Sequence, residues 1–335
     1  MNYFLYIVKL VAMNKSEFFQ NQFWSDIAVN SFQSKNRLFT EAKIPLYRGE
    51  TSLSLVFEKF NLNSKEIFTA CRFGPVYFSD YFDFKGIDLS TLSTLNQIIE
   101  HAQNNNADLI WFSNIPKESQ FYQVLKQFSQ SYSNSYFLEC IPTVGINLSY
   151  NYTKYLQGIS RNCRHNILRK TKALDSQKAQ HSIISATEEN LQNLLNLQNS
   201  RSKANNSLNS FLENQEIYSF IMNLAKKSGI KISQIEINET VISQLLILEF
   251  NNTLAVLIQG FHQEFAKYSP SFVNLSKLIE YASLNGFNYI DLLRGKEGYK
   301  KHFINQENPM TKFLYFTNQN TNTNTIIDFI KRFEE

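Results

Sequence analysis

The stretch that decides the fold covers residues 260–303 and reads GFHQEFAKYSPSFVNLSKLIEYASLNGFNYIDLLRGKEGYKKHF. It predicts, in order, the end of a strand, a helix that begins at Ser269, a buried strand over Phe287–Leu293 and a second helix start at Tyr299. Ser269 suits the N-cap position, and Pro270 suits the first helical position, where its missing N–H costs nothing. This order places the free N–H groups of a helix start beside the end of a strand, an arrangement that binds phosphate.

One face of the predicted helix is apolar. Its side chains recur at helical spacing, at Leu275, Leu278, Ile279 and Ala282. Gly286 lies where glycine commonly ends a helix. The strand that follows is short and mostly apolar, which is typical of a strand buried between two layers. Asp291 interrupts this strand, and a buried acid is costly unless it is paired, hydrogen-bonded or protonated.

The composition indicates a globular protein of two domains. The chain has 335 residues, of which 43% are hydrophobic, and it contains 29 Phe and 17 Tyr. This length is long for one core and sufficient for two. Polar residues over 142–151 mark a boundary, so we expect domains over 1–150 and 151–335. The net charge of +4 is too small to indicate nucleic-acid binding from bulk electrostatics.

The cysteines and the hydropathy favour a cytoplasmic location and no metal site. Cys71, Cys140 and Cys163 are odd in number and widely spaced, so they fit neither a disulfide framework nor a zinc site. No segment of the sequence approaches the roughly 20 apolar residues of a membrane span. The sequence also shows no Ser/His/Asp arrangement, P-loop or dinucleotide fingerprint, so hydrolase, kinase and dehydrogenase functions have no support.

The order of predicted elements places the chain in the α/β class, with an α+β mixed sheet. The second half begins with helices at 153–174, 188–202 and 213–228, and continues with strands at 231–237, 241–250 and 253–262. The two-residue turns Asn238–Glu239 and Asn251–Asn252 make these strands a meander. The first half alternates strands and helices at a similar spacing.

Three stretches resemble the CelD-type acetyltransferases, GNAT proteins associated with bacterial cellulose and exopolysaccharide synthesis and related to the FemABX peptidyltransferases. Phe265–Pro270 is similar to that family's Tyr-Ser-Pro-Gly helix start. Asp291–Lys300 is similar to its Asp-Phe-x-x-Gly-x-x-x-Tyr-Lys block, and Arg161–Lys170 to the basic first helix of its second domain. The chain departs from the family at Ser271, where glycine is usual. The Gly-rich pyrophosphate loop of most GNAT proteins is absent.

The resemblance implies tandem GNAT-like domains, of which the first is degenerate and shapes the acceptor cleft. It also implies that acyl-CoA lies between two splayed parallel strands of the second domain. The residues implied in binding the cofactor's diphosphate are Ser269, Ser271, Phe272 and Val273, with Lys267 and Lys300 as charge partners. Three of them would use their backbone amides, those of residues 271–273. An ordinary capped helix accounts for the same helix start.

The transfer needs a polarised thioester carbonyl, a base for the amine and an acid for the thiolate. A backbone N–H at the end of strand 253–262 would polarise the carbonyl. Tyr299 takes the place of the thiolate-protonating tyrosine, although a core or surface tyrosine fits as well. His262 is the candidate base, with a structural histidine as the alternative. Asp291 either orients a neighbouring cation or the amine, or it braces the fold.

The acceptor is expected to carry phosphate, which arginine binds well. The residues expected to contact it are Arg161, Arg164, Arg169 and Arg294. A solvated basic helix face is the alternative for the first three. The implied function is transfer of an acyl group, such as acetyl, from acyl-CoA to an amine of a cell-envelope polysaccharide precursor or sugar nucleotide. Two alternatives stay open: a FemABX-like aminoacyltransferase that uses aminoacyl-tRNA, and a non-catalytic scaffold of a polysaccharide assembly system.

Overall fold

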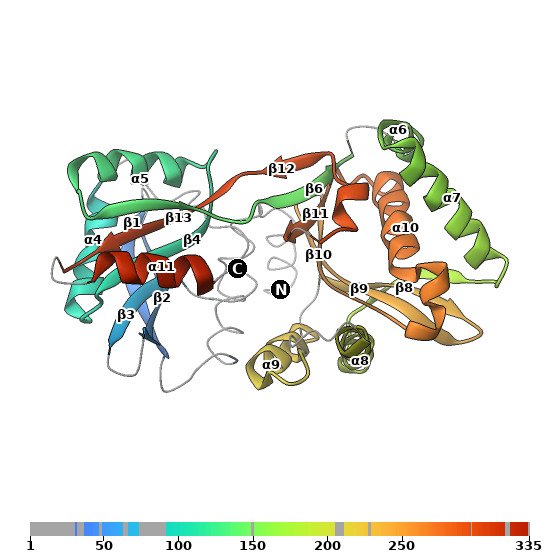
Figure 1. The fold of residues 1–335 in the computed structure, drawn as a ribbon, viewed down its shortest axis with the longest axis horizontal. Coiled ribbons are helices and arrows are strands. Elements are labelled where there is room, and N and C mark those ends of the chain that lie inside the picture. The colour runs from blue at the N-terminus through green and yellow to red at the C-terminus, as the bar shows by residue number, and fades with distance from the viewer. Residues whose placement is uncertain are drawn as a thin grey trace. The chain divides into compact units, whose positions relative to one another are not determined.

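The computed structural model describes residues 31, 37–46, 49–62, 66–73, 92–148, 151–204, 211–226, 229–295, 297–318 and 322–333. The chain divides into two compact units, and we describe each by itself (Figure 1). The six-stranded unit takes in the described residues of Lys15–Pro142 together with those of Asn308–Glu335. The seven-stranded unit takes in those of Thr143–Glu307. The end of the chain therefore groups with its first half, whereas the sequence suggested one division near residue 150.

The six-stranded unit is a mixed sheet covered by helices on both faces. Its strands in sheet order are β1 (Arg37–Leu46), β2 (Gly49–Asn61), β3 (Ile67–Phe73), β4 (Leu109–Pro116), β13 (Met310–Phe316) and β5 (Ser135–Glu139). Its helices are α4 (Leu92–Asn104), α5 (Gln120–Ser131) and α11 (Thr323–Phe333). Alternate residues of β4 enter two separate cores: Ile110 and Phe112 pack with α4 and α5, and Leu109 and Trp111 pack with α11. Helices on both faces explain why β4 begins with four consecutive apolar residues, Leu109–Phe112.

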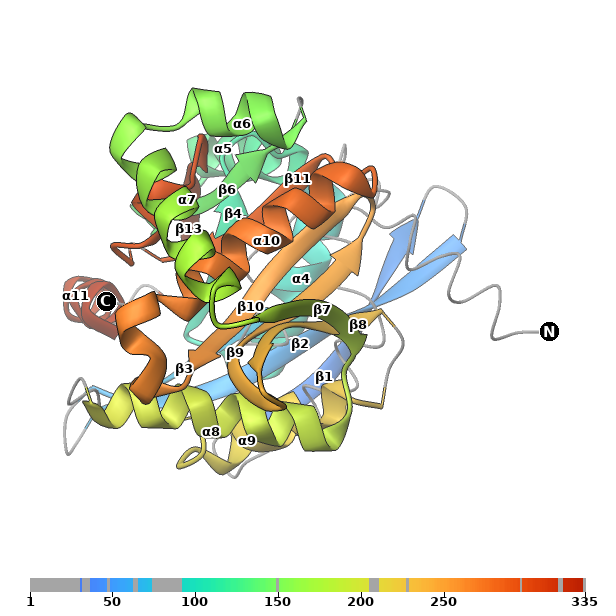
Figure 2. The ribbon, with the colours of Figure 1, turned by 90° about the vertical axis from the view of Figure 1, so that its right-hand side faces the viewer.

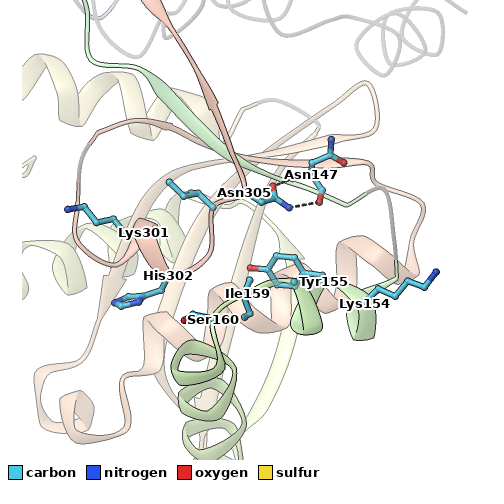
Figure 3. Close-up of a pocket in the computed structure, with 10 residues that line it drawn as sticks. Asn147, Lys154, Tyr155, Ile159, Ser160, Lys301, His302 and Asn305 are labelled. Atoms are coloured by element: carbon cyan, nitrogen blue, oxygen red, sulfur yellow. Dashed lines mark hydrogen bonds between the residues drawn. The ribbon is translucent and has the colours of Figure 1, made fainter.

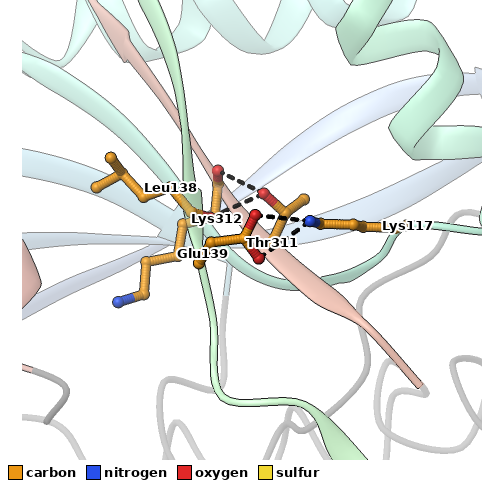
Figure 4. A network of polar contacts seen from close by, with 5 residues as sticks. All are labelled: Lys117, Leu138, Glu139, Thr311 and Lys312. Atoms are coloured by element: carbon orange, nitrogen blue, oxygen red, sulfur yellow. Dashed lines mark hydrogen bonds and ion pairs between the residues drawn. The ribbon is translucent and has the colours of Figure 1, made fainter. Parts of the chain in front are cut away.

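Strand β13 explains why the end of the chain belongs to this unit. It pairs antiparallel with β4 on one side and with β5 on the other, so it lies inside the sheet. Side chains add to this pairing (Figure 4): the Thr311 hydroxyl donates to the Leu138 carbonyl at 2.8 Å. Lys117 pairs with the Glu139 carboxylate at 2.7 Å. The Glu139 side chain is exposed, so this ion pair stabilises the sheet by at most about 1 kcal/mol.

A buried ion pair joins β2 and β3. The Arg72 guanidinium lies 3.1 Å from the Glu58 carboxylate, and both residues are 6% exposed. The guanidinium also lies 4.0 Å from the centroid of the Trp111 ring. The pair and the ring together satisfy a charge that would otherwise be costly to bury.

The seven-stranded unit is a second mixed sheet. Its strands in sheet order are β12 (Gln306–Asn308), β6 (Thr143–Asn147), β11 (Tyr289–Arg294), β10 (Thr253–Phe261), β9 (Thr240–Phe250), β8 (Ile230–Ile237) and β7 (Gln180–Ser185). Helices α6 (Tyr152–Gly158), α7 (Arg161–Asp175) and α10 (Pro270–Leu284) lie on one face, and α8 (Glu188–Ala204) and α9 (Gln215–Leu224) on the other (Figure 2). β10 and β11 are parallel and are joined by α10. The six-stranded unit has a comparable pair, because β3 and β4 are parallel and are separated in sequence by α4.

The predicted meander is confirmed. β8, β9 and β10 pair antiparallel in sequence order. All four turn residues have left-handed backbones, with φ of 48° at Asn238, 65° at Glu239, 42° at Asn251 and 55° at Asn252. Asparagine tolerates this conformation, and two such residues in succession form the hairpin turn whose twist matches the strands.

Two predicted helices differ from the structure. The single helix expected at 153–174 is two helices, because α6 ends at Gly158 and Ser160 begins α7 by accepting a hydrogen bond from the Cys163 N–H. The helix expected from Tyr299 is one three-residue 3₁₀ turn, η2 (Lys300–His302). Asn305 follows it and pairs with Asn147 of β6: its side chain accepts from the Asn147 N–H and donates to the Asn147 carbonyl. These two bonds return the chain to the sheet, so the helix does not extend beyond this single turn.

Candidate functional site

The two parallel strands of the seven-stranded unit separate partway along their length. They pair only through Thr253–Ala255 of β10 and Tyr289–Asp291 of β11, although both strands continue. On its other side, each strand pairs with a neighbour through an irregular register. The pairing of β10 with β9 shifts register between Val256 and Ile258, and the pairing of β11 with β6 shifts after Asp291. A bulge bends its strand, so the facing edges of β10 and β11 part beyond this point.

Asp291 fixes the irregularity in β11. Its side chain is fully buried, and its Oδ1 accepts a hydrogen bond from the Leu293 N–H at 2.8 Å. Leu293 has a left-handed backbone, with φ of 59°, which is unusual for a leucine. An aspartate that bonds the amide two residues ahead forms a local turn. The buried acid is therefore hydrogen-bonded, as one of the sequence alternatives required, and it shapes the end of the strand.

Helix α10 begins at the predicted place but with a different cap. Ser269 has a left-handed backbone, with φ of 54°, and its hydroxyl makes no capping hydrogen bond. Its carbonyl instead accepts from the N–H groups of Phe272, at 3.1 Å, and Val273, at 3.2 Å, so two of the three amides expected at the diphosphate already donate within the helix. Pro270 occupies the first turn. The positive end of the helix dipole thus lies directly after η1 (Gln263–Tyr268), the 3₁₀ turn that follows β10.

The first turn of α10 contacts both the end of β10 and η2. The Ser271 hydroxyl lies 3.5 Å from the Gly260 carbonyl of β10. The Phe272 ring packs against Phe303, with centroids 4.6 Å apart. Lys267 of η1 is exposed, and its carbonyl accepts from the Lys170 ammonium of α7 at 2.6 Å. The structure therefore brings the predicted cofactor residues of η1 and α10 to one place, beside the strand that separates from β11.

Lys300 and Arg294 meet at the exit of β11. The Lys300 ammonium is 2.9 Å from the Glu297 carboxylate and donates to the Arg294 carbonyl at 2.7 Å. Lys300 is 4% exposed, so its charge is held inside the protein. Tyr299 precedes η2 and packs against the core of the unit. Through these contacts Lys300 fixes the position of the segment that follows β11.

His262 directly follows β10. Its backbone N–H donates to the Ile242 carbonyl at 2.9 Å, and its ring packs edge-on against the Phe265 ring. The ring Nδ1 is buried and has no hydrogen-bond partner in the part of the chain that the structure describes. A buried nitrogen without a partner is uncommon and is compatible with a functional role.

The arginines of α7 form their contacts within α6 and α7. Arg161 and Arg169 are exposed, and Arg169 donates to the Asn166 side chain. Arg164 turns back to the end of α6, where it donates to the Leu156 carbonyl at 3.2 Å. The structure places these cations on one helix, but their contacts do not connect them to the separated strands.

A pocket of about 340 Å³ lies beside η2 (Figure 3). It is lined by Asn147, Lys154, Tyr155, Gly158, Ile159, Ser160, Lys301, His302, Ile304 and Asn305. The Tyr155 hydroxyl donates to the Phe303 carbonyl at 2.9 Å, and the Cys163 thiol contacts the His302 carbonyl at 3.0 Å. These buried groups hold η2 against α6 and α7. No local pattern in the sequence indicates this role, because each of the two bonds joins residues that lie far apart along the chain.

Neither a metal site nor a membrane helix is present in the described ranges. No three His, Cys, Asp or Glu side chains there lie close enough together to hold a metal ion. No helix among those ranges has the length and hydropathy to cross a bilayer.

A family model described as an acetyltransferase (GNAT) domain matches residues 161–301. No curated protein matches the chain by sequence. The match covers α7 to η2 and so includes the separated strands and the start of α10.

Solved structures share the fold of the whole chain. FemX has a TM-score of 0.61 at 12% identity, over 95% of this chain and 94% of its own. L-PGS from Bacillus licheniformis has 0.55 at 10%, over 86% and 88%. The C-terminal domain of a putative lysylphosphatidylglycerol synthetase from Agrobacterium fabrum has 0.55 at 9%, over 92% and 91%. The predicted α/β fold of tandem GNAT-like domains is thus confirmed: residues 161–301 match the model of a GNAT acetyltransferase domain, and the chain shares its fold with FemX.

Proposed function

We propose that this chain is an acyltransferase that transfers an acyl group, such as acetyl, from acyl-CoA to an amine. The separation of β10 and β11 beyond Ala255 and Asp291 carries the proposal. Strand edges that no longer pair with each other offer N–H and C=O groups to an extended ligand, such as the arm that bears the thioester. The match of residues 161–301 to the GNAT domain supports this use of the gap.

The diphosphate of the cofactor would bind at the start of α10. A helix N-terminus favours negative charge, and the exposed Lys267 adds a cation beside it. We assign Lys300 a different part from the one expected from the sequence. Its ammonium is buried against Glu297 and the Arg294 carbonyl, so it would hold the exit of β11 rather than meet an exposed phosphate.

The transfer itself needs two proton movements. The amine nitrogen attacks the thioester carbonyl carbon, the carbon–sulfur bond breaks, and CoA leaves as a thiolate. His262 would take the proton from the amine, and its unpartnered Nδ1 supports that role. Tyr299 would return a proton to the thiolate. A backbone N–H of β10 beyond the bulge would polarise the carbonyl.

The acceptor we propose is a phosphate-bearing glycan precursor or sugar nucleotide of the cell envelope, modified in the cytoplasm. The similarity of three sequence stretches to the CelD-type proteins supports this choice. The exposed guanidinium groups of Arg161 and Arg169 on α7 are available to phosphate oxygens. Arg294, at the end of β11, would contact the acceptor near the reacting amine.

Calorimetric titration with acetyl-CoA and with free CoA tests the donor. We expect micromolar binding of both. Lys267→Glu should weaken it about fivefold to tenfold, because it reverses a charge beside the diphosphate. Lys226→Glu is the matched control: Lys226 is also exposed, but it follows α9 on the other face of the sheet. Absence of CoA binding, or equal loss in both variants, would contradict the proposal.

Aminoacyl transfer from tRNA is the second candidate. It is favoured by the fold shared with FemX and with the putative lysylphosphatidylglycerol synthetase. Bulk tRNA in the same calorimeter distinguishes the two donors. Each phosphate that a lysine or arginine neutralises adds roughly 0.7 to 0.9 to the slope of log affinity against log salt concentration, so tRNA binding should be strongly salt-dependent. Such binding without any CoA binding would replace the first proposal.

A further inference from the structure

A chain of polar side chains runs through the apolar layer between α10 and the strands beneath it. Asn274 of α10, Ser233 of β8 and Ser243 of β9 are all fully buried. They link His181 of β7 to Ser271 in the first turn of α10. We call these five residues the buried polar chain. The nearest apolar neighbours on α10 are Val273 and Leu275, which enter the core as the periodicity predicts.

The hydrogen bonds between the side chains of the buried polar chain all run in one direction, from His181 toward Ser271. The Ser233 hydroxyl donates to Asn274 Oδ1 at 2.7 Å, so at 2.8 Å from His181 Nε2 it must accept. The Asn274 amide nitrogen donates to the Ser243 hydroxyl at 3.2 Å and to the Ser233 carbonyl at 3.1 Å. The Ser243 hydroxyl is then left to donate to Ser271 Oγ at 3.4 Å. Ser271 donates to the Gly260 carbonyl at 3.5 Å.

The buried polar chain ends at the proposed donor site. Gly260 lies near the end of β10, beyond the point where β10 and β11 separate. Ser271 lies in the first turn of α10, where the positive end of the helix dipole would meet the diphosphate. The last two hydrogen bonds are long, so they are readily tightened or lost. They nevertheless connect the helix start to both β9 and β10.

An asparagine is an unexpected side chain in this apolar layer. A polar side chain inside an apolar layer lowers stability unless all of its groups are bonded, and even then an apolar side chain of similar size often does as well. Leucine at position 274 would fill the layer without needing Ser233 or Ser243. Leucine would not donate to the Ser243 hydroxyl, and so it would not orient the group that bonds Ser271 in the first turn of α10.

We infer that Asn274 and Ser243 are positioning residues that hold Ser271, and with it the first turn of α10, against the end of β10, so that the positive end of the helix dipole is set for the donor's phosphates. This inference rests on the proposed function, because it assigns the helix start to a CoA diphosphate. It also gives a reason for Ser271, since the glycine that the CelD-type family has there carries no hydroxyl to close the chain.

Two serine-to-alanine variants separate positioning from stability. Ser243→Ala cuts the link between Asn274 and Ser271. Ser233→Ala removes a hydroxyl from the adjacent strand β8, and Ser233 is as fully buried as Ser243. Asn274 nevertheless keeps its orientation in this variant, because it still donates to the Ser233 backbone carbonyl. Each variant also loses one buried hydrogen bond to Asn274, so both should destabilise the protein to a similar extent. The affinity for CoA is the readout that only positioning would change.

We expect Ser243→Ala and Ser271→Ala each to raise the Kd of CoA about fivefold, which corresponds to one hydrogen bond. Ser233→Ala should change it less than twofold. The double variant Ser243→Ala/Ser271→Ala should bind CoA no more weakly than either single variant, because both cut the same link. Thermal unfolding of all four proteins records the loss of stability alongside.

The outcomes distinguish this inference from the proposed function. If the unmodified protein binds no CoA, the proposed function fails and the inference fails with it. If it binds CoA but Ser243→Ala and Ser233→Ala have the same Kd, the inference alone is overturned. It is also overturned if Ser271→Ala weakens binding while Ser243→Ala does not, because Ser271 would then contact the phosphate by itself.

Discussion

Replacing Asp291 by alanine should unfold the end of β11 before it affects anything else. The carboxylate is fully buried and accepts the Leu293 N–H at 2.8 Å. Removing it leaves a buried amide without that acceptor, which costs about 1 to 3 kcal/mol. It also removes the bond that holds Leu293 in a left-handed conformation, which costs a further 1 kcal/mol or so when nothing supports it. We therefore expect Asp291→Ala to lower the free energy of unfolding by about 3 kcal/mol.

Asp291→Asn is the matched control. The asparagine keeps an oxygen at the Oδ1 position, so the bond to the Leu293 N–H survives, while the charge is lost and the second oxygen becomes an NH₂ group. Its free energy of unfolding should fall by about 1 kcal/mol, the difference between a charged and a neutral acceptor. Urea denaturation at pH 7, followed by circular dichroism and extrapolated linearly to zero denaturant, measures both values.

Two results would refute this account of Asp291. One is a loss smaller than 1 kcal/mol in the alanine variant, which would mean that the carboxylate does not hold the turn. The other is an equal loss in both variants, which would mean that the charge matters and the hydrogen bond does not. The second result would favour an electrostatic role toward the cation or the amine at the site.

Three further changes test other parts of the fold. Burial, with a smaller effect of the Lys277 ammonium, lowers the pKa of His181 from 6.5 to about 4, so the unfolded chain takes up its proton first as the pH falls. The free energy of unfolding should drop by about 2 kcal/mol between pH 7 and pH 5, and His181→Gln should remove that drop in urea titrations at the two pH values. Arg72→Ala should lower the free energy of unfolding by about 3 to 5 kcal/mol because it removes the cation that pairs with the buried Glu58 carboxylate, and a double variant with Glu58→Leu should recover most of this loss. Gly260→Ala would place a Cβ 2.8 Å from the backbone nitrogen of Gln198 in α8, so thermal unfolding should show a loss of about 1 to 3 kcal/mol; an unchanged melting temperature would show that α8 can move aside.

The sequence predicts those elements whose signals are local. Helix α10 follows from its apolar spacing and from Ser269–Pro270, and the meander follows from asparagines that accept left-handed turns. The assignment of the fold class needed no more than the order of these elements. The start of α10 and the end of β10 are predicted for the same reason, since they are adjacent along the chain.

The parts that the sequence did not predict depend on contacts between distant residues. Ser233, Ser243 and Asn274 look like surface residues in the sequence, and only the packing of α10 on β8 and β9 buries them. One signal was available: Asn274 stands next to Leu275 on the apolar face and interrupts it. The left-handed Leu293 had no signal, because its conformation depends on a side chain two residues earlier in a strand that otherwise reads as regular.

The place of β13 in the six-stranded sheet has a consequence for how the protein is made. A ribosome releases β1 to β5 first, then the whole of Thr143–Glu307, and β13 only afterwards. Until β13 arrives, β4 and β5 lack the neighbour that lies between them, and each presents an open edge to other chains. The half that is synthesised first is therefore the half that completes its sheet last, so a nascent chain that stalls before residue 310 would be a candidate for chaperone binding and for aggregation.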